Sequence, residues 1–406
     1  MPHQRAHLPR RLAIAIAVAA IALPVAATAQ PLRIAVMGDQ TGPYADNGGP
    51  GSVLAARMAI EDFGAKVLGR PIELIVGDDQ NRPDIGVAMA RKWLADDKVD
   101  AILTYTISPI ALAVQPLVTE FKKPHLIAGS GSADLTGKSC SPMAINFVYD
   151  TYALPKAITR SLIAAGKDTW FFITVDYAFG AAMEAGATQF IKEAGGKVVG
   201  GVKHPLGNSD FSAQLLQAQA SGAKVIALAN AGADFTNAVK QAAEFNITAG
   251  GQVLASTGTT INTIVAVGLP AAQGMQFTVP FYWDQNAETR AWSEKFMARF
   301  NNRAPTYLQS GAYSAVTHYL KAVQATGTAD GEKVMAQMKA TPINDFQMRN
   351  VTIRADGTTL RPMYLVQVKK PAESKAPYDV YNILSTVAPD QVWRTPAEAG
   401  CPFVKP

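Results

Sequence analysis

The chain has 406 residues, of which 48% are hydrophobic and 17% are charged, with 37 Lys and Arg against 32 Asp and Glu. Three of the basic residues (Arg5, Arg10 and Arg11) stand before an apolar run near the N-terminus, and without them the formal net charge falls from +5 to +2. No cluster of Lys and Arg follows an expected helix, which argues against nucleic acid as a partner.

The N-terminus has the parts of a secretory signal peptide. The three arginines precede an apolar run from Leu12 to Val25, and residues 27–29 (Ala-Thr-Ala) have the small-residue pattern of a cleavage site. The run of about fourteen residues is short for a membrane span, which needs roughly 20. We therefore predict that residues 1–29 are removed on export and that the mature chain begins at Gln30; an uncleaved anchor is the alternative.

Short β-branched runs alternate with longer amphipathic stretches from Pro31 onward, and the same alternation starts again after Asp150. Strands are expected at 32–36, 72–76, 101–104, 125–128, 169–175, 197–203, 225–229 and 252–255. Helices are expected at 52–65, 84–95, 109–121, 179–194, 211–220 and 234–245. Apolar strands separated by helices are typical of parallel sheets that are covered on both faces. Because about 375 mature residues exceed one core of roughly 250–300 residues, the pattern predicts an α/β fold with two Rossmann-like lobes.

The last third has a different pattern. A helical region is expected from 281 through 297 and at 307–325, followed by a β-hairpin of 348–354 and 363–369 around Asp356-Gly357. If these helices join the first lobe and the hairpin joins the second, the chain crosses between the lobes several times, which makes a hinge and a closing cleft. The predicted bounds are 30–149 with 283–345 for the first lobe, 150–282 with 346–385 for the second, and 386–406 for a tail.

Cys140 and Cys401 are the two cysteines of the chain. Because an even number of cysteines in an exported protein usually pairs, we expect a disulfide between them, which would join the tail to a loop of the first lobe; two free thiols are the alternative. The histidines of the mature chain (His125, His204 and His318) stand apart from the cysteines. The sequence therefore predicts no metal and no cofactor.

Candidate binding residues lie in the loops after the expected strands, where ligands of open α/β sheets bind. Ser108-Pro109 is a typical helix start, and such a start also offers free N–H groups and a hydroxyl to an anion. The loop 128–132 (Ala-Gly-Ser-Gly-Ser) is either merely flexible or lets the backbone approach a ligand closely. Phe179, at an expected helix start, is either a core residue or a wall for stacking. The catalytic motifs G-x-S-x-G and H-E-x-x-H are missing from the sequence, which argues against an enzyme.

An ordered set of short motifs covers nearly all of the mature chain. The motifs are Ile34-Ala35-Val36, Thr41-Gly42-Pro43, Asp78-Asp79 with Pro83, Ser108, Leu135-Thr136, Asp176-Tyr177-Ala178-Phe179-Gly180 and Asp210-Phe211-Ser212. In this order they resemble the leucine/isoleucine/valine-binding protein family, which has the type I periplasmic binding fold. The resemblance implies a monomeric periplasmic substrate-binding protein of an ABC importer. Such a protein captures a small carboxylate between its lobes, without a cofactor, and delivers it to a permease in the inner membrane.

The resemblance also implies the site residues. Ser108 and the loop of Ala128, Gly129, Ser130 and Gly131 would hold the ligand carboxylate, and Phe179 stands where the family often has a stacking tyrosine.

Two positions of the second lobe depart from the family pattern. Gly258 lies in a stretch, 256–259, where members that bind α-amino acids carry an acid, and Ala231 lies where another aromatic residue is usual. A buried ammonium without a partner is costly, so we expect a carboxylate that lacks the amine and has a larger apolar body.

Three further elements are similar to the branch of the family that imports aromatic acids. They are Ser108-Pro109, the stretch 149–152 (Tyr-Asp-Thr-Tyr) and the Val-Lys-Lys-Pro element that ends at Pro371. Tyr152 and Tyr282, at expected lobe crossings, either line the larger pocket or only pack. The expected ligand is an aromatic acid of the benzoate or hydroxycinnamate type. The alternatives are a branched-chain amino acid or its keto analogue, an exported α/β enzyme, and a ligand-sensing regulator.

Overall fold

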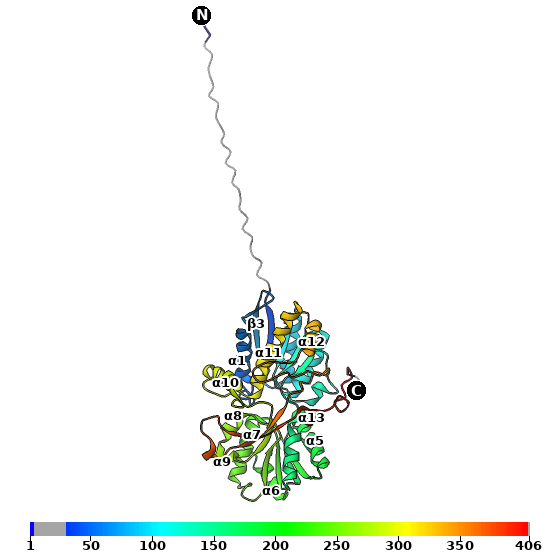
Figure 1. Cartoon of the computed structure of the whole chain (residues 1–406), viewed down its shortest axis with the longest axis vertical. Coiled ribbons are helices and arrows are strands. Elements are labelled where there is room, and N and C mark those ends of the chain that lie inside the picture. Colours follow the sequence, from blue (N-terminus) through cyan, green and yellow to red (C-terminus); the bar gives the residue numbers. More distant parts are fainter. Residues whose placement is uncertain (4–29, 405–406) are drawn as a thin grey trace.

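The computed structural model describes residues 1–3 and 30–404, and Figure 1 shows two lobes stacked along the long axis. The predicted signal peptide covers residues 1–29. Apart from residues 1–3, it lies outside the described residues. None of the described helices combines the length and the apolar composition that crossing a membrane requires.

The first lobe contains a six-stranded sheet in the order β2-β3-β1-β4-β5-β6. Its strands are β1 (Leu32–Gly38), β2 (Lys66–Val67), β3 (Arg70–Asp78), β4 (Ala101–Thr104), β5 (His125–Ile127) and β6 (Ala144–Asn146). All of them run parallel except β2, which pairs antiparallel with β3. The helices around this sheet are α1 (Gly49–Phe63), α2 (Pro83–Ala95), α3 (Ser108–Glu120), the 3₁₀ helix η1 (Ala133–Thr136), α10 (Ala287–Arg299), α11 (Tyr307–Thr326) and α12 (Gly331–Ala340).

The alternation of side chains along β1 explains the three layers of this lobe. Ile34 and Val36 belong to the core shared with α1 and α11, whereas Ala35 and Met37 belong to the core shared with α2 and α3. Successive side chains of a strand point to opposite faces, so an apolar run without interruption is covered by helices on both sides.

The second lobe contains a parallel sheet in the order β10-β9-β7-β8 and a smaller antiparallel sheet in the order β11-β12-β13. The parallel strands are β7 (Thr169–Val175), β8 (Lys197–His204), β9 (Val225–Ala229) and β10 (Val253–Ser256). The antiparallel strands are β11 (Gln276–Val279), β12 (Met363–Val368) and β13 (Tyr381–Val387). The remaining elements are α4 (Ala153–Ala164), α5 (Ala178–Glu193), α6 (Ser212–Ala220), α7 (Gly232–Glu244), α8 (Ile261–Val267), α9 (Leu269–Ala272), the 3₁₀ helix η2 (Pro371–Glu373), α13 (Pro389–Val392) and α14 (Pro396–Ala399).

Both parallel sheets have the same winding, with the first strand of each half in an inner position. The chain runs from β1 outward to β3 and then back to β4, and in the second lobe from β7 outward to β8 and then back to β9. The predicted α/β fold with two Rossmann-like lobes is confirmed. The point where the winding reverses is where open α/β sheets bind ligands.

Arg361 lies where the segments that cross between the lobes meet. It is 2% exposed, and its guanidinium donates hydrogen bonds to the carbonyls of Phe147 (3.1 Å), after β6, and Pro280 (2.6 Å), after β11. The carbonyl of Arg361, before β12, accepts a hydrogen bond from Nε1 of Trp393 in the tail (2.8 Å). One residue therefore ties three crossings and the tail together at the hinge.

The predicted hairpin of 348–354 with 363–369 is wrong. β12 pairs with β11 and β13 instead. The tight turn does form, because Gly357 has φ 90° and its N–H donates to the carbonyl of Arg354 (2.8 Å). The carbonyl of Gly357 then accepts from the N–H of Asn146 in β6 (2.8 Å). This contact attaches the stretch before Arg361 to the first lobe, whereas the predicted bounds place it in the second; the bounds themselves stay a prediction.

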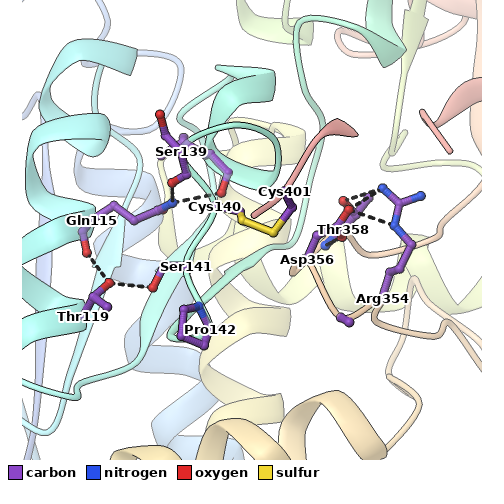
Figure 2. Close-up of a disulfide and its surroundings, with 12 residues drawn as sticks. Gln115, Thr119, Ser139, Cys140, Ser141, Pro142, Arg354, Asp356, Thr358 and Cys401 are labelled. Carbon is purple, nitrogen blue, oxygen red and sulfur yellow. Dashed lines mark hydrogen bonds and ion pairs between the residues drawn. A yellow bond between two sulfur atoms is a disulfide. The ribbon is translucent and has the colours of Figure 1, made fainter. Parts of the chain in front are cut away.

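The tail returns from the second lobe to the first, where Cys401 forms a disulfide with Cys140 (Figure 2). The two Cα atoms are 5.6 Å apart, and both cysteines are buried. The loop that carries Cys140 is held from α3, because Nε2 of Gln115 donates to the carbonyl of Ser139 (2.5 Å). The disulfide therefore joins the tail to a loop of the first lobe that a hydrogen bond from α3 holds in place.

Candidate ligand site between the lobes

A cavity with about 540 Å³ of empty space lies between the two lobes. Loops at the carboxyl ends of strands in both parallel sheets form its walls, together with the start of α11. The first lobe contributes Tyr44, Asn47, Tyr105, Thr106, Ile107, Ser108, Gly129, Gly131, Tyr149, Tyr307 and Leu308, and the second contributes Tyr177, Phe179, Ala231, Gly258, Thr259 and Thr260. Six of its seventeen lining residues are aromatic, and apolar walls with a few polar groups are typical of small-molecule pockets.

Six of the ten predicted ligand residues line this cavity. They are Ser108, Gly129, Gly131, Phe179, Ala231 and Gly258. The two loop glycines are required by their aromatic neighbours: a Cβ at Gly129 would lie 2.8 Å from Cβ of Tyr105, and one at Gly131 would lie 2.8 Å from Cε2 of Tyr149.

The other four predicted residues do not line the cavity. Ala128 lies in the first-lobe core, and Oγ of Ser130 donates to the carbonyl of Thr106 (2.8 Å), so it supports the cavity wall from behind. The ring of Tyr152 packs edge-on against Phe190, with centroids 4.8 Å apart. Tyr282 donates to the carbonyl of Tyr378 (3.2 Å) and lines a smaller neighbouring cavity. In this structure both tyrosines have the packing role that was the alternative.

Five tyrosines in the cavity wall were not among the predicted site residues: Tyr44, Tyr105, Tyr149, Tyr177 and Tyr307. Burial raises the pKa of each phenol above its ordinary value, so all five are neutral. Tyr105 directly follows β4, Tyr177 precedes α5 and Tyr307 begins α11, whereas Tyr44 and Tyr149 lie further along the loops after β1 and β6. Loops after the strands are where open α/β sheets bind ligands.

Three of these tyrosines are held by hydrogen bonds that shape the cavity. The hydroxyl of Tyr149 donates to the carbonyl of Gly129 (2.9 Å), within the first lobe. The hydroxyls of Tyr44 and Tyr177 are 3.0 Å apart and pair across the lobes. The loop of Tyr44 is shaped by Asp39, whose carboxylate accepts from the N–H groups of Gly42 (2.5 Å) and Tyr44 (2.8 Å).

No Asp, Glu, Lys, Arg or His side chain from the described residues lines the cavity. Instead, α3, α5, α7, α8 and α11 all begin at a lining residue or directly after one. A helix N-terminus carries a partial positive charge and unpaired N–H groups. The cavity therefore favours an anion although it contains no cationic side chain.

Ser108 is the most prominent polar group in the first-lobe wall. It is the first residue of α3, it is 1% exposed, and its Oγ has no hydrogen-bond partner among residues 30–404. Pro109 follows in the first turn and has no N–H of its own. The N–H groups of Ile110 and Ala111 already donate to the carbonyl of Ile107 (3.1 and 3.2 Å), so the serine hydroxyl is the group at this helix start that is free to bind an anion.

Hydrogen bonds between the lobes close the cavity. Oγ1 of Thr260 and Oγ1 of Thr263 both donate to Oδ1 of Asn47, at 3.1 and 3.3 Å. Nδ2 of Asn262 donates to the carbonyl of Asp46 (2.9 Å). Asn47 and Thr260 also line the cavity, so these contacts join the two lobes at its wall.

Comparisons with known proteins agree with this architecture. Residues 31–375 match the sequence model of a family described as periplasmic binding protein. A solved periplasmic binding protein from Burkholderia mallei is 42% identical, with a TM-score of 0.90, over 93% of this chain and 100% of that one. A branched chain amino acid ABC transporter periplasmic ligand-binding protein from Burkholderia xenovorans LB400 is 36% identical, with a TM-score of 0.82, over 92% and 99%.

A curated relative agrees as well. The leucine-, isoleucine-, valine-, threonine-, and alanine-binding protein of Pseudomonas aeruginosa is 26% identical over 339 residues, which are 81% of this chain and 87% of that protein. The chain therefore belongs to the periplasmic binding protein family, the substrate-binding proteins of ABC transporters.

Proposed function

We propose that this protein binds a small carboxylate between its lobes, with an aromatic acid as the favoured ligand, and delivers it to the permease of an ABC importer. The observation that carries the proposal is the unpartnered hydroxyl of Ser108 at the start of α3, in a cavity without charged side chains. A carboxylate accepts a hydrogen bond from such a hydroxyl, and the partial positive charge of a helix start favours its negative charge.

The cavity offers nothing to pair with an ammonium group. An α-amino acid would bury its ammonium without an acidic side chain among the described lining residues, which is unfavourable. The names of the Pseudomonas aeruginosa and Burkholderia xenovorans relatives nevertheless refer to amino acids, so a branched-chain amino acid or its keto acid is the second candidate. The keto acid suits the cavity better because it has no ammonium.

The aromatic walls favour a ring as the ligand body. Tyr177 and Phe179 stack with centroids 6.0 Å apart and planes at 24°, and Tyr149 meets Tyr307 edge-on at 5.3 Å. Aromatic side chains attract further rings beyond the effect of burial alone. A planar aryl group therefore gains contacts that a branched aliphatic side chain cannot make.

We further propose that the mature protein works in the periplasm as a monomer and that it binds without catalysis. A hydrolase of this shape would need a base beside its nucleophile. The Oγ of Ser108, the candidate nucleophile, has no such partner within residues 30–404.

Isothermal titration of the mature protein with benzoate, cinnamate, leucine and 4-methyl-2-oxopentanoate tests this function, with benzamide as the neutral control. We expect the aromatic acids to bind and benzamide not to bind. Ser108→Ala should raise the Kd of benzoate roughly 10- to 150-fold, because a hydrogen bond to a charged group contributes about 1.5–3 kcal/mol.

The variant should melt no lower than the wild type, because the hydroxyl that it loses has no partner in the free protein. If leucine alone binds, the proposed ligand is a branched-chain amino acid, the second candidate, and not an aromatic acid. Failure of every acid to bind, or a benzoate Kd that Ser108→Ala leaves unchanged, would contradict the carboxylate site.

A further inference from the structure

The loop after β10 places an unpartnered hydroxyl in the cavity from the second lobe, opposite the unpartnered hydroxyls of Thr106 and Ser108 in the first lobe. Thr259 lies between the end of β10 at Ser256 and the start of α8 at Ile261. It lines the cavity and is 1% exposed, and its Oγ1 has no hydrogen-bond partner in the described chain, residues 30–404.

The neighbouring hydroxyls of this loop are already used. Oγ of Ser256 accepts from the N–H of Gly258 (3.1 Å), and Oγ1 of Thr257 donates to the carbonyl of Leu228 (3.0 Å). Thr260 also lines the cavity, but its hydroxyl bonds to Asn47 across the lobes (3.1 Å). Among Ser256, Thr257, Thr259 and Thr260, Thr259 is therefore the residue whose hydroxyl has no partner in the described chain. Thr259 also lines the cavity.

The loop cannot easily turn this hydroxyl toward water. It is packed tightly onto the helices below it, since a Cβ at Gly258 would lie 2.9 Å from Cδ1 of Leu154 in α4. Thr257, on the other side of Gly258, is fixed to β9 by its bond to Leu228. A buried hydroxyl without a partner is unfavourable, and the group that satisfies it has to come from inside the cavity.

We infer that the ligand carries a second polar group, opposite its carboxylate, and that Thr259 binds this group. The inference rests on the proposed function, in which Ser108 holds the carboxylate. The second group is uncharged, because the described lining residues offer no counterion to a second carboxylate or to an ammonium. A hydroxyl suits it well, since the threonine can either donate or accept.

The ligand class is accordingly a hydroxylated aromatic acid, with the carboxylate on the first lobe and the ring hydroxyl on the second. Such a ligand bridges the two sheets, so its two ends both favour the closed arrangement. Thr259 is the residue that distinguishes it from the unsubstituted acid.

The test compares four acids by isothermal titration: benzoate, 3-hydroxybenzoate, 4-hydroxybenzoate and 4-methylbenzoate, whose methyl group resembles the hydroxyl in size. The proteins are the wild type, Thr259→Val and the matched control Thr257→Val. In the wild type we expect one of the hydroxybenzoates to bind about tenfold more tightly than benzoate and 4-methylbenzoate. Thr259→Val should lose this preference and melt no lower than the wild type, and it should bind benzoate at least as tightly, because closure then buries no unpartnered hydroxyl.

Thr257→Val should show the reverse pattern, with a lower melting temperature and the hydroxyl preference intact, because its hydroxyl is bonded to Leu228. Equal affinity of the wild type for all four acids would overturn the inference and leave the carboxylate site standing. A Thr259→Val variant that weakens benzoate as much as hydroxybenzoate would also overturn it. If none of the acids binds, the proposed function itself fails.

Discussion

Buried serine and threonine hydroxyls nearly always find a partner within the protein. Ser108 and Thr259 lack one among residues 30–404 and line the same cavity from opposite lobes; Thr106 in the first-lobe wall also lacks one, as do Ser52, Thr278, Ser293 and Thr317 outside the cavity. An unpartnered buried polar group costs about 1–3 kcal/mol, and for Ser108 and Thr259 a bound ligand can offset this cost. Both are explained if a ligand completes their hydrogen bonds, and this is why their removal should harm binding and spare stability.

Asp79 is a buried acid whose removal should act on stability and its pH dependence. It follows β3 and is fully buried, and burial raises its pKa to about 6, with Asp39 and Asp78 adding to the effect. A carboxyl whose pKa is higher in the folded than in the unfolded state stabilises the protein below about pH 4. This contribution is lost as the pH rises through about 6.

Asp79→Asn should therefore raise the free energy of unfolding at pH 7.5 by about 2 kcal/mol and leave it nearly unchanged at pH 4. The asparagine oxygen can still accept the N–H of Asn81, as Oδ1 of Asp79 does (2.9 Å). Urea unfolding of both proteins at the two pH values measures the effect. A gain of equal size at both pH values would show that folding does not shift the pKa of this carboxyl.

Six of the predicted site residues line the cavity, among them Ser108, Gly129 and Gly131. These three stand in loops after β4 and β5, at the carboxyl ends of parallel strands, where open α/β sheets bind ligands. The aromatic residues were harder, as Tyr149 and Tyr152 illustrate. Tyr149 lines the cavity, while Tyr152 stands at the start of α4 and packs on Phe190. Which of the two points inward depends on where α4 begins, and no local pattern marks that residue.

At the level of elements, local patterns predicted strands and helices but not distant partners. The strands at 101–104, 169–175 and 225–229 were predicted with their observed bounds. The stretch 363–369 was correctly predicted as a strand. Its neighbour β11 lies far away in the sequence, and neither β11 nor β13 was predicted. Alternating side chains reveal a strand and its buried face, and they do not reveal the strand beside it.

A similar limit applies to α10, which begins at Ala287 rather than near 281. Residues 280–286 form a lobe crossing, and the side chain of Asn286 caps the helix by accepting the N–H groups of Glu288 and Thr289 (2.9 and 3.0 Å). Asparagine is a preferred residue directly before a helix and marks a helix start, but the apolar stretch Phe281-Tyr282-Trp283 gave the stronger helical pattern.

The contact between the loop after β1 and α8 should set how long any ligand stays bound. Asn47→Ala removes the acceptor for Thr260 and Thr263. A neutral hydrogen bond contributes about 1 kcal/mol, so we expect Kd to rise roughly five- to tenfold through faster dissociation. The factor should be the same for every ligand, since these bonds join the lobes. Stopped-flow fluorescence measures both rates.

The matched control is Asn237→Ala. Its Nδ2 donates to the carbonyl of Asn208 (3.3 Å), within the second lobe, so the variant should leave dissociation unchanged. Asn47 also lines the cavity. A loss that is confined to a single ligand would therefore mean that Asn47 contacts this ligand and does not act as a link between lobes.

At the scale of the molecule, the disulfide closes a long loop and should contribute strongly to stability. Cys140 and Cys401 are separated by 261 positions. Reducing the bond restores the freedom of the unfolded chain, which for a loop of this length corresponds to about 5 kcal/mol, although typical effects are about 2–4 kcal/mol. We expect Cys140→Ser with Cys401→Ser to lower the denaturation midpoint of the mature protein, and reduction of the wild type to do the same.

Alkylation without prior reduction, followed by mass spectrometry, checks the bond itself. The wild type should take up no label before reduction and two labels after it. Two reactive thiols in the unreduced protein would refute the disulfide. A midpoint that is insensitive to reductant would show that the tail is held without it.

The placement of the aromatic residues also separates two optical signals. All five tryptophans lie outside the cavity, which is lined by tyrosines, and two of them belong to the hinge. Nε1 of Trp283 donates to the carbonyl of Tyr378 and Nε1 of Trp393 to that of Arg361, each at 2.8 Å. Tyrosine absorbance thus reports the arrival of a ligand, and tryptophan emission reports rotation of the lobes. The delay between the two signals in one mixing experiment is the time that the protein takes to close.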